Sequence, residues 1–153
     1  MLQYDFEESV GYWVTLVAQA FQKALNEELL PHGITVRQSQ VLGWLVLEGK
    51  LSQVELAAKM MIEPPTLVGI LDRMERDGWI SRVGCPEDRR KKIIRIRPEA
   101  ATAWEKIVQC ARRVRGRATD GLSTQQLRTL KKLLRLVNRN LGPRTGSLVG
   151  HSS

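Results

Sequence analysis

Apolar residues recur every three or four positions along most of the chain, the spacing expected of helices that bury one face. This pattern predicts a first helix over residues 6 to about 30, because Pro31 and Gly33 then break the chain. A second helix is predicted over residues 35–47, with Thr35 as its N-cap. The chain should therefore be mainly helical.

Two further helices follow the same spacing near the C-terminus. Pro98 begins a long one, and Ser123 begins the last one, since Gln126 three residues later completes a capping box. The apolar face of each helix is expected in the core or in an interface. In chain order, these faces are Val10, Trp13, Val14, Val17, Phe21, Ala24 and Leu25; Val41, Leu42, Leu45 and Val46; Ala101, Trp104, Ile107, Val108, Ala111 and Val114; and Leu127, Leu130, Leu133, Leu134, Val137 and Leu141.

Two short helices joined by a tight turn are predicted in the centre of the chain. Ser52 and Glu55 form a capping box that begins the first. The second, over residues 66–76, follows two prolines, which suit a first helical turn, and Gly78 ends it. Both helices can turn apolar side chains toward one small core, namely Leu56, Ala57, Met60, Ile62, Leu67, Ile70, Leu71 and Met74.

A basic hairpin is predicted directly after this pair. Two β-type runs, over residues 80–83 and 93–97, flank a polar loop that starts with turn-forming residues. From Arg82 to Arg97 there are seven cationic side chains against two acidic ones, a local balance of +5. Helix, turn, helix and basic hairpin is the order of a winged helix, which binds duplex DNA.

The second short helix is predicted to be the recognition helix. The stripe opposite its core has polar or small residues at steps of three and four, so this face can lie in a major groove without exposing the core. The predicted contact residues are Pro65, Thr66, Gly69 and Arg73.

Two places before this helix have features of their own, the start of the first short helix and the turn between the two helices. Ser52 and Gln53, at the start of the first short helix, are candidate phosphate contacts. Met61 lies where a helix-turn-helix usually has glycine, and a left-handed conformation there would store strain of about 1–2 kcal/mol.

These residues resemble the MarR family of bacterial regulators, and within it the SlyA-like branch. The resemblance rests on the consecutive runs at residues 62–68, 71–80 and 88–92, and it covers roughly residues 7–141. It implies a homodimer that binds a short inverted repeat, with each recognition helix in a major groove and each wing at an adjacent minor groove. In the family's Asp-x-Arg wing motif the arginine enters the minor groove, which corresponds to Arg90 here.

The resemblance also implies the roles of the residues around Arg90. Asp88 would orient the wing by pairing with a neighbouring cation, and Arg89, Lys91 and Lys92 would complete the wing contacts. Gly69 departs from the branch, whose members often have an arginine there. One arginine–guanine contact, worth roughly 1–3 kcal/mol of discrimination, is therefore expected to be missing.

This order of elements predicts a mainly α protein with a small β-hairpin (α+β). Residues 1–33 are expected to form the N-terminal helix of a dimerisation lobe, residues 34–97 the winged helix-turn-helix lobe, and residues 98–141 the C-terminal helices of the dimerisation lobe; residues 142–153, rich in Gly and Ser, are expected to be a disordered tail. The leucine stripe of the last helix packs either on the first helix of its own chain or on a second subunit. The second alternative is preferred, through Val10, Leu130, Leu134, Val137 and Leu141.

The composition agrees with a DNA-binding role. There are 24 Lys and Arg against 16 Asp and Glu, and the net charge of +8 favours a polyanionic partner, although an acidic membrane surface would satisfy it equally. No apolar run reaches the ~20 residues that cross a bilayer, so a cytoplasmic protein is expected. Two further basic runs are interpreted as solvated helix faces, with flanking phosphates as the alternative: Arg112, Arg113, Arg115 and Arg117; and Lys131, Lys132, Arg135 and Arg139.

A small-molecule effector is a further expectation. Aromatic stacking suits a planar phenolic ligand, and the candidate pocket residues are Trp13, Gln22, Trp44 and Trp104, although core packing is the preferred interpretation of the tryptophans. SlyA-like relatives that bind aromatic carboxylates have arginines on the first helix, where this chain has Gln19 and Gln22, so a simple salicylate-type site is not expected. Cys85 is interpreted as a passive wing cysteine rather than an oxidant sensor.

An enzyme is not expected from this inventory. The two histidines, His32 and His151, lie in a turn and in the tail, and no nucleophile–base pair, phosphate-binding glycine loop or metal-ligand spacing is evident. Neither a cofactor nor a metal is predicted. The alternatives to a site-specific regulator are an architectural protein that coats DNA without sequence preference and a winged helix that binds protein partners.

Overall fold

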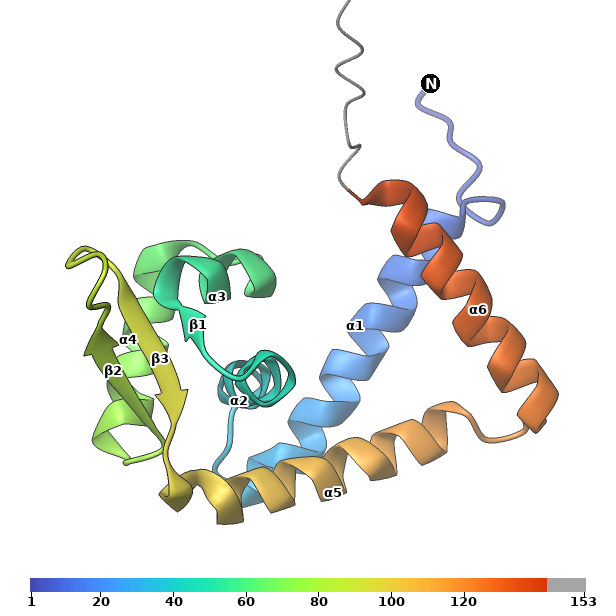
Figure 1. Ribbon diagram of the computed structural model, residues 1–153. Helices are drawn as coiled ribbons and strands as arrows, with labels where there is room; N and C mark the ends of the chain where they lie inside the picture. The colour runs from blue at the N-terminus through green and yellow to red at the C-terminus, as the bar shows by residue number, and fades with distance from the viewer. Residues whose placement is uncertain (143–153) are drawn as a thin grey trace, which may run out of the picture. The chain divides into compact units, whose positions relative to one another are not determined.

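The computed structural model describes residues 1–142. It divides into two compact units, one of Met1–Arg115 and one that begins at Gly116, and each is described by itself. The architecture is mainly helical with one small antiparallel sheet, as the sequence predicts (Figure 1). The predicted disordered tail lies, apart from Gly142, outside the described residues.

The first helix is shorter than predicted. Helix α1 spans Val10–Leu29, because Ser9 is its N-cap and accepts a hydrogen bond from the Tyr12 backbone N–H. Phe6 lies before the helix, where its ring packs edge-to-face against two tyrosine rings. A 3-10 turn, η1 at Leu30–His32, follows, and α2 spans Val36–Glu48 behind the predicted N-cap Thr35.

The predicted helix-turn-helix is confirmed. Helix α3 spans Gln53–Met60 behind the Ser52–Glu55 capping box, and α4 spans Pro64–Arg76. Met61 has φ 54° and ψ 43°, the left-handed conformation expected of the turn. The turn therefore has the left-handed backbone that glycine adopts readily, but at a methionine, for which this conformation is unfavourable.

The hairpin belongs to a three-stranded sheet. Strands β2 (Ile80–Gly84) and β3 (Lys92–Ile96) pair antiparallel, and β1 (Leu51–Ser52) pairs with the other edge of β3 through Leu51 opposite Ile94. The sequence did not predict β1, since two residues are too short for an alternating pattern. This strand joins the start of α3 to the middle of β3, at Ile93 and Ile94 (Figure 1).

The core of the first unit lies among α2, α3, α4 and the sheet. Its fully buried side chains include Leu42, Leu56, Leu67, Leu71, Met74 and Ile94. Two predicted core residues are corrected: Val46 is 50% exposed, and Ile62 is only partly buried at the edge of the cluster. Val46 lies in the last turn of α2, and Ile62 lies in the turn between α3 and α4, so neither is enclosed on all sides.

The helix after the hairpin has a different register from the one predicted. Pro98–Ala100 form a 3-10 turn, η2, and α5 spans Ala101–Ala118. Its buried face is Ala103, Ile107, Cys110 and Val114, whereas Ala101 and Ala111 are exposed and Trp104 is half-buried. Ile107 and Val114 belong to both the predicted and the observed face, whereas Ala103 and Cys110 are buried in place of Ala101 and Ala111.

The apolar face of α1 is largely uncovered. Leu29 is the one buried residue of this helix, whereas Val10, Trp13, Val14 and Val17 are all exposed. A contiguous apolar face of this kind on a helix is typical of an interaction surface.

The second unit is built around α6, Thr124–Leu141, which begins at the predicted Ser123–Gln126 capping box. Leu130, Leu133, Leu134 and Leu141 are exposed along one side of it. Within the described residues, no helix combines the length and apolar character needed to cross a membrane.

Candidate nucleic-acid interface

Helix α4 separates a buried face from an exposed one. Leu67, Ile70, Leu71 and Met74 are buried, so the helix cannot rotate without opening the core. The four predicted contact residues, Pro65, Thr66, Gly69 and Arg73, all lie on the exposed side. No heavy atom would come within 4 Å of a Cβ built on Gly69, so this part of the face is open.

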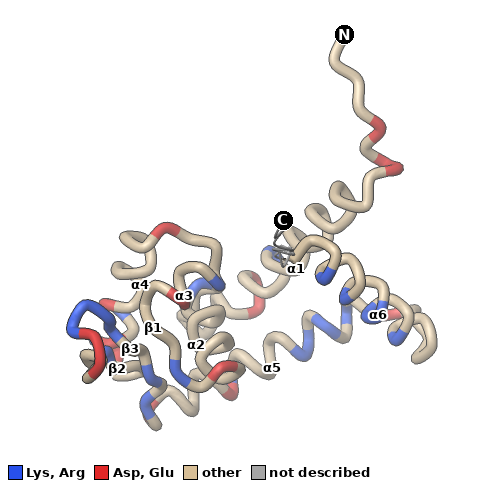
Figure 2. Tube along the Cα trace, turned by 45° about the horizontal axis from the view of Figure 1, so that its top comes forward, with Lys and Arg blue, Asp and Glu red and all other residues tan. Residues whose placement is uncertain are grey.

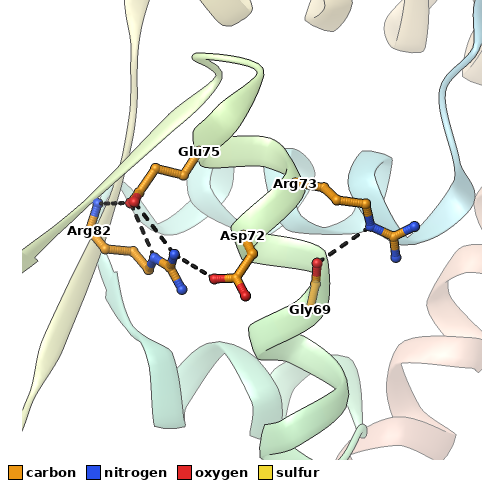
Figure 3. Close-up of polar contacts among 5 residues, drawn as sticks. All are labelled: Gly69, Asp72, Arg73, Glu75 and Arg82. Carbon is orange, nitrogen blue, oxygen red and sulfur yellow. Dashed lines mark hydrogen bonds and ion pairs between the residues drawn. The ribbon is translucent and has the colours of Figure 1, made fainter.

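Arg73 lies along the surface of its own helix. Its Nε donates to the backbone oxygen of Gly69 at 3.4 Å, one turn earlier. Figure 3 shows the guanidinium on the side of α4 away from Asp72 and Glu75. Arg73 can therefore leave this weak contact for a base or phosphate without breaking an ion pair.

The sequence analysis missed the residue that joins α4 to the hairpin, Arg82 of β2. Its Nη2 donates to Asp72 Oδ1 at 2.6 Å, its Nε donates to Glu75 Oε2 at 3.1 Å, and its backbone N–H donates to the same Glu75 oxygen at 3.0 Å (Figure 3). We call this group the Arg82 clamp. The three-residue spacing of Asp72 and Glu75 is the signal that places both carboxylates on one helix face.

The clamp also sets the charge of this side of the interface. Hydrogen bonds from the guanidinium of Arg82 hold the pKa of Glu75 below its usual value. The same bonds, first to Glu75 and then to Asp72, raise the pKa of Arg82. The cation therefore offsets carboxylate charge that would otherwise repel DNA phosphates.

The tip of the hairpin is a compact basic loop. The Cys85 backbone N–H donates to the Lys91 oxygen, and the Lys91 N–H donates to the Asp88 oxygen, both at 3.0 Å. Asp88 was expected to pair with a cation, but its Oδ1 instead accepts the backbone N–H of Arg90 at 3.0 Å. The carboxylate thus shapes the loop, while Arg89, Arg90, Lys91 and Lys92 all remain exposed. Figure 2 shows the Lys and Arg positions at the tip of the hairpin in blue.

The candidate phosphate contacts lie at the start of α3. Ser52 is only 4% exposed, and its hydroxyl accepts the Glu55 backbone N–H at 3.1 Å as a helix cap. Gln53 is more accessible. Ser52 therefore has a structural task already, and Gln53 is the better placed of the two to reach DNA.

The candidate effector residues do not share one cleft. Trp104 lines an apolar cleft of about 340 Å³ with Leu42, Val46 and the segment from Ile96 to Ala101. Gln22 lines another, of about 160 Å³, with Phe21, Leu25, Val36, Gln40, Ala111 and Val114. Lys59 Nζ lies 4.9 Å from the ring centroid of Trp44, and Trp13 is exposed with its indole N–H donating to the Glu7 backbone oxygen.

These features define a winged helix-turn-helix protein, and comparison with known proteins gives its family. A model of the MarR family matches residues 32–91. The chain is 30% identical over 132 residues to the multiple antibiotic resistance protein MarR of Salmonella typhimurium, covering 84% of this chain and 90% of that protein.

Solved structures are similar over most of the chain. A mutant of MarR from E. coli superposes with a TM-score of 0.76 at 27% identity, over 85% of this chain and 96% of the other. The same mutant in complex with operator DNA gives a TM-score of 0.74 at 28% identity, over 88% and 99%. The chain belongs to the MarR family of DNA-binding transcription regulators.

Proposed function

We propose that this regulator binds an inverted-repeat operator as a homodimer through α4 and the basic hairpin. The observation that carries the proposal is the exposed polar stripe of α4, fixed by the Arg82 clamp beside a loop of four exposed cations. Recognition helices read base edges, whereas phosphate contacts set register. A MarR of E. coli, similar along 88% of this chain, has been solved with operator DNA.

Roles for individual residues follow from these positions. Thr66, Gly69 and Arg73 face the major groove, with Pro65 at the start of the stripe. Arg90 enters an adjacent minor groove, where a narrow groove concentrates negative potential. Arg89, Lys91, Lys92 and Gln53 contact phosphates. Because Gly69 offers no side chain, groove shape contributes more of the specificity than in a relative with arginine there.

The dimer is formed by the helices outside residues 34–97. Two half-sites about one helical turn apart require a two-fold symmetric protein. The exposed apolar residues Val10, Leu130, Leu134 and Leu141, together with the half-buried Val137, supply the contacts. In this division residues 1–33 and 98–141 form the dimerisation lobe, and binding to the chromosome places the protein in the cytoplasm.

Effector control is the second part of the proposal. A ligand that binds one dimer geometry better than another changes the spacing of the two recognition helices and weakens operator binding. The two apolar clefts of the first unit, beside Trp104 and beside Gln22, support a small aromatic ligand. SlyA-like membership rests on the runs at residues 62–68, 71–80 and 88–92 and is proposed on them alone.

Selection of bound sequences from a random duplex pool, with the mass of the protein in solution, tests this function. An inverted repeat and a dimer mass are expected, with preference for the recovered site of roughly 10³-fold or more over random duplex. Tight binding without a recovered motif would instead indicate an architectural protein. Failure to bind duplex at all would indicate a protein-binding module.

Arg90→Ala tests the wing. Operator affinity should fall by at least about tenfold, the loss expected of one charged minor-groove contact. Folding should be retained, because Arg90 is exposed at the loop tip. Equal affinity of Arg90→Ala and the wild type would remove the wing from the interface.

A further inference from the structure

Most of the net charge of the described chain lies outside the winged-helix unit. Residues 1–115 contain 17 Lys and Arg against 15 Asp and Glu, a balance of +2. Residues 116–142 contain six cations against one acid, a balance of +5. The excess charge that predicts a polyanionic partner is therefore concentrated in the second unit rather than in the unit that carries the wing.

This charge is arranged on one face of α6. Arg128, Lys132, Arg135 and Arg139 follow one another at steps of four, three and four residues, which places them in one row, and Lys131 borders it. We call these five residues the basic face of α6. All five are exposed, and no Asp or Glu lies between Thr124 and Leu141 (Figure 2). Lys132, Arg135 and Arg139 line a shallow hollow of about 410 Å³ with Asn138.

A merely solvated helix face rarely has this composition. Solvent-exposed helices usually mix both signs of charge at steps of three and four, because opposite charges stabilise the helix and like charges destabilise it. Here Arg128 and Lys132, Lys131 and Arg135, and Arg135 and Arg139 are like-charge pairs four residues apart. None of the five cations forms a salt bridge within residues 1–142. An anionic ligand would relieve this repulsion.

The opposite face of the helix restricts what that ligand can be. Leu130, Leu134 and Leu141 lie across the helix from the row of cations and remain exposed. A second copy of the chain that covers the leucines therefore leaves the cations pointing away from it. The same coverage removes the apolar face with which an amphipathic helix would enter a membrane interface.

We propose that the basic face of α6 binds the phosphate backbone of duplex DNA outside the operator half-sites. This inference rests on the proposed function, which supplies duplex DNA as the polyanion held at the protein. Three of the five residues are arginines, whose planar guanidinium matches phosphate geometry. Contacts to phosphate contain no sequence information, so they raise affinity for long DNA without changing the preferred site.

The test is the salt dependence of binding to a long duplex with the operator in random flanks. Each phosphate contact contributes about 0.9 to the slope of log affinity against log salt concentration, so Lys132→Gln, Arg135→Gln and Arg139→Gln together should lower the slope by about 2.7 per subunit. The preference for operator over random duplex of equal length should not change. The matched control, Lys23→Gln, Arg37→Gln and Lys106→Gln, removes the same charge from exposed positions outside the wing and should leave the slope nearly unchanged.

A charge-conserving variant separates DNA contact from a structural role. Arg128→Lys, Arg135→Lys and Arg139→Lys should retain most of the wild-type slope. A slope of the glutamine variant equal to that of its control would overturn the proposal. A change in the dimer mass of the glutamine variant would also overturn it, because the basic face would then serve assembly. The same holds if this variant loses binding to vesicles of phosphatidylserine and phosphatidylcholine while its slope on DNA is unchanged. Absence of any operator preference in the wild type would refute the proposed function instead, since the slope on random duplex is still measurable.

Discussion

Arg82 joins the hairpin to α4 through ion pairs with two carboxylates. It is on β2, its side chain is 20% exposed, and it binds both Asp72 and Glu75 of α4. A guanidinium can donate to two carboxylates at once with fixed directions, which a lysine cannot do. The clamp therefore holds the hairpin at one angle to the recognition helix and offsets carboxylate charge near the DNA.

Replacement of Arg82 should weaken operator binding while the protein stays folded. Arg82→Ala frees the hairpin and leaves Asp72 and Glu75 without their cation, so we expect a loss of about tenfold or more in affinity. The operator affinity of Arg82→Lys should lie between those of the wild type and Arg82→Ala, because lysine keeps the charge but not the geometry of the guanidinium. A spin label on Cys85, which is half-exposed on the hairpin whereas Cys110 is buried, would report the added mobility. Unchanged affinity and mobility in Arg82→Ala would contradict the clamp.

The clamp should also make stability depend on pH through Glu75. Because its pKa is lowered in the folded state, the ionised carboxylate stabilises the protein above the unfolded pKa, and this stabilisation is lost as pH falls through the folded pKa. The free energy of unfolding of Glu75→Gln should lie below that of the wild type by less than about 1 kcal/mol near neutral pH, as for other exposed ion pairs. Denaturant titrations should show the difference vanish once the pH has fallen below the folded pKa of Glu75. A constant difference at all pH values would show that the effect is not the ion pair.

At the scale of elements, the turn between α3 and α4 is under local strain. Met61 is left-handed and 91% exposed, so its side chain gains no packing energy in return. The turn persists because the helices on both sides are held by buried Leu56 and Leu67. Tertiary packing thus imposes on the turn a conformation that its own sequence disfavours.

Met61→Gly should therefore stabilise the protein. Relief of the left-handed conformation is worth about 1 kcal/mol, less the entropy that glycine adds to the unfolded chain. Thermal unfolding should show a higher Tm, with operator affinity unchanged if the turn serves only to connect the helices. Gly78→Ala is a useful control that should lower Tm, since Gly78 has φ 78°, a conformation that alanine adopts only with strain. A lower Tm for Met61→Gly would show that relief of strain at this turn does not outweigh the added entropy of the unfolded chain.

At the scale of the whole molecule, apolar helix faces remain uncovered in both units. The exposed residues of α1 and α6 are large and aliphatic or aromatic, unlike the scattered apolar residues of an ordinary surface. A two-fold dimer covers such faces on both subunits at once. The same dimer provides the two recognition helices that an inverted repeat requires.

Negative charge introduced among the exposed leucines of α6 should therefore disrupt both dimer formation and DNA binding. Leu130→Glu with Leu134→Glu is expected to give a monomer mass and to lower operator affinity by about 10²-fold or more, because one half-site is lost. Leu136→Glu is the control, since Leu136 lies to the side of the stripe. Light scattering and operator titration would measure both effects. A dimer mass in the double variant would place the interface elsewhere.

Local sequence determined the helices and the hairpin of this protein. The capping boxes at Thr35, Ser52 and Ser123 each begin a helix within a residue of the predicted position, because the bonds join residues only three apart. The exposed stripe of α4 was equally predictable, because the apolar positions of this helix fix its buried side and therefore also the side that faces outward. The predicted membership of the MarR family is confirmed.

Tertiary structure decided what depends on residues distant in the chain. The pairing of Leu51 with Ile94, the register of α5 and the uncovered end of α2 at Val46 follow from how the elements pack, which periodicity does not contain. Arg82 was counted in advance only as one of seven wing cations, and the path of β2 beside α4 is what brings it to Glu75. Local hydrogen bonds are fixed by spacing, whereas ion pairs between elements are fixed by the fold.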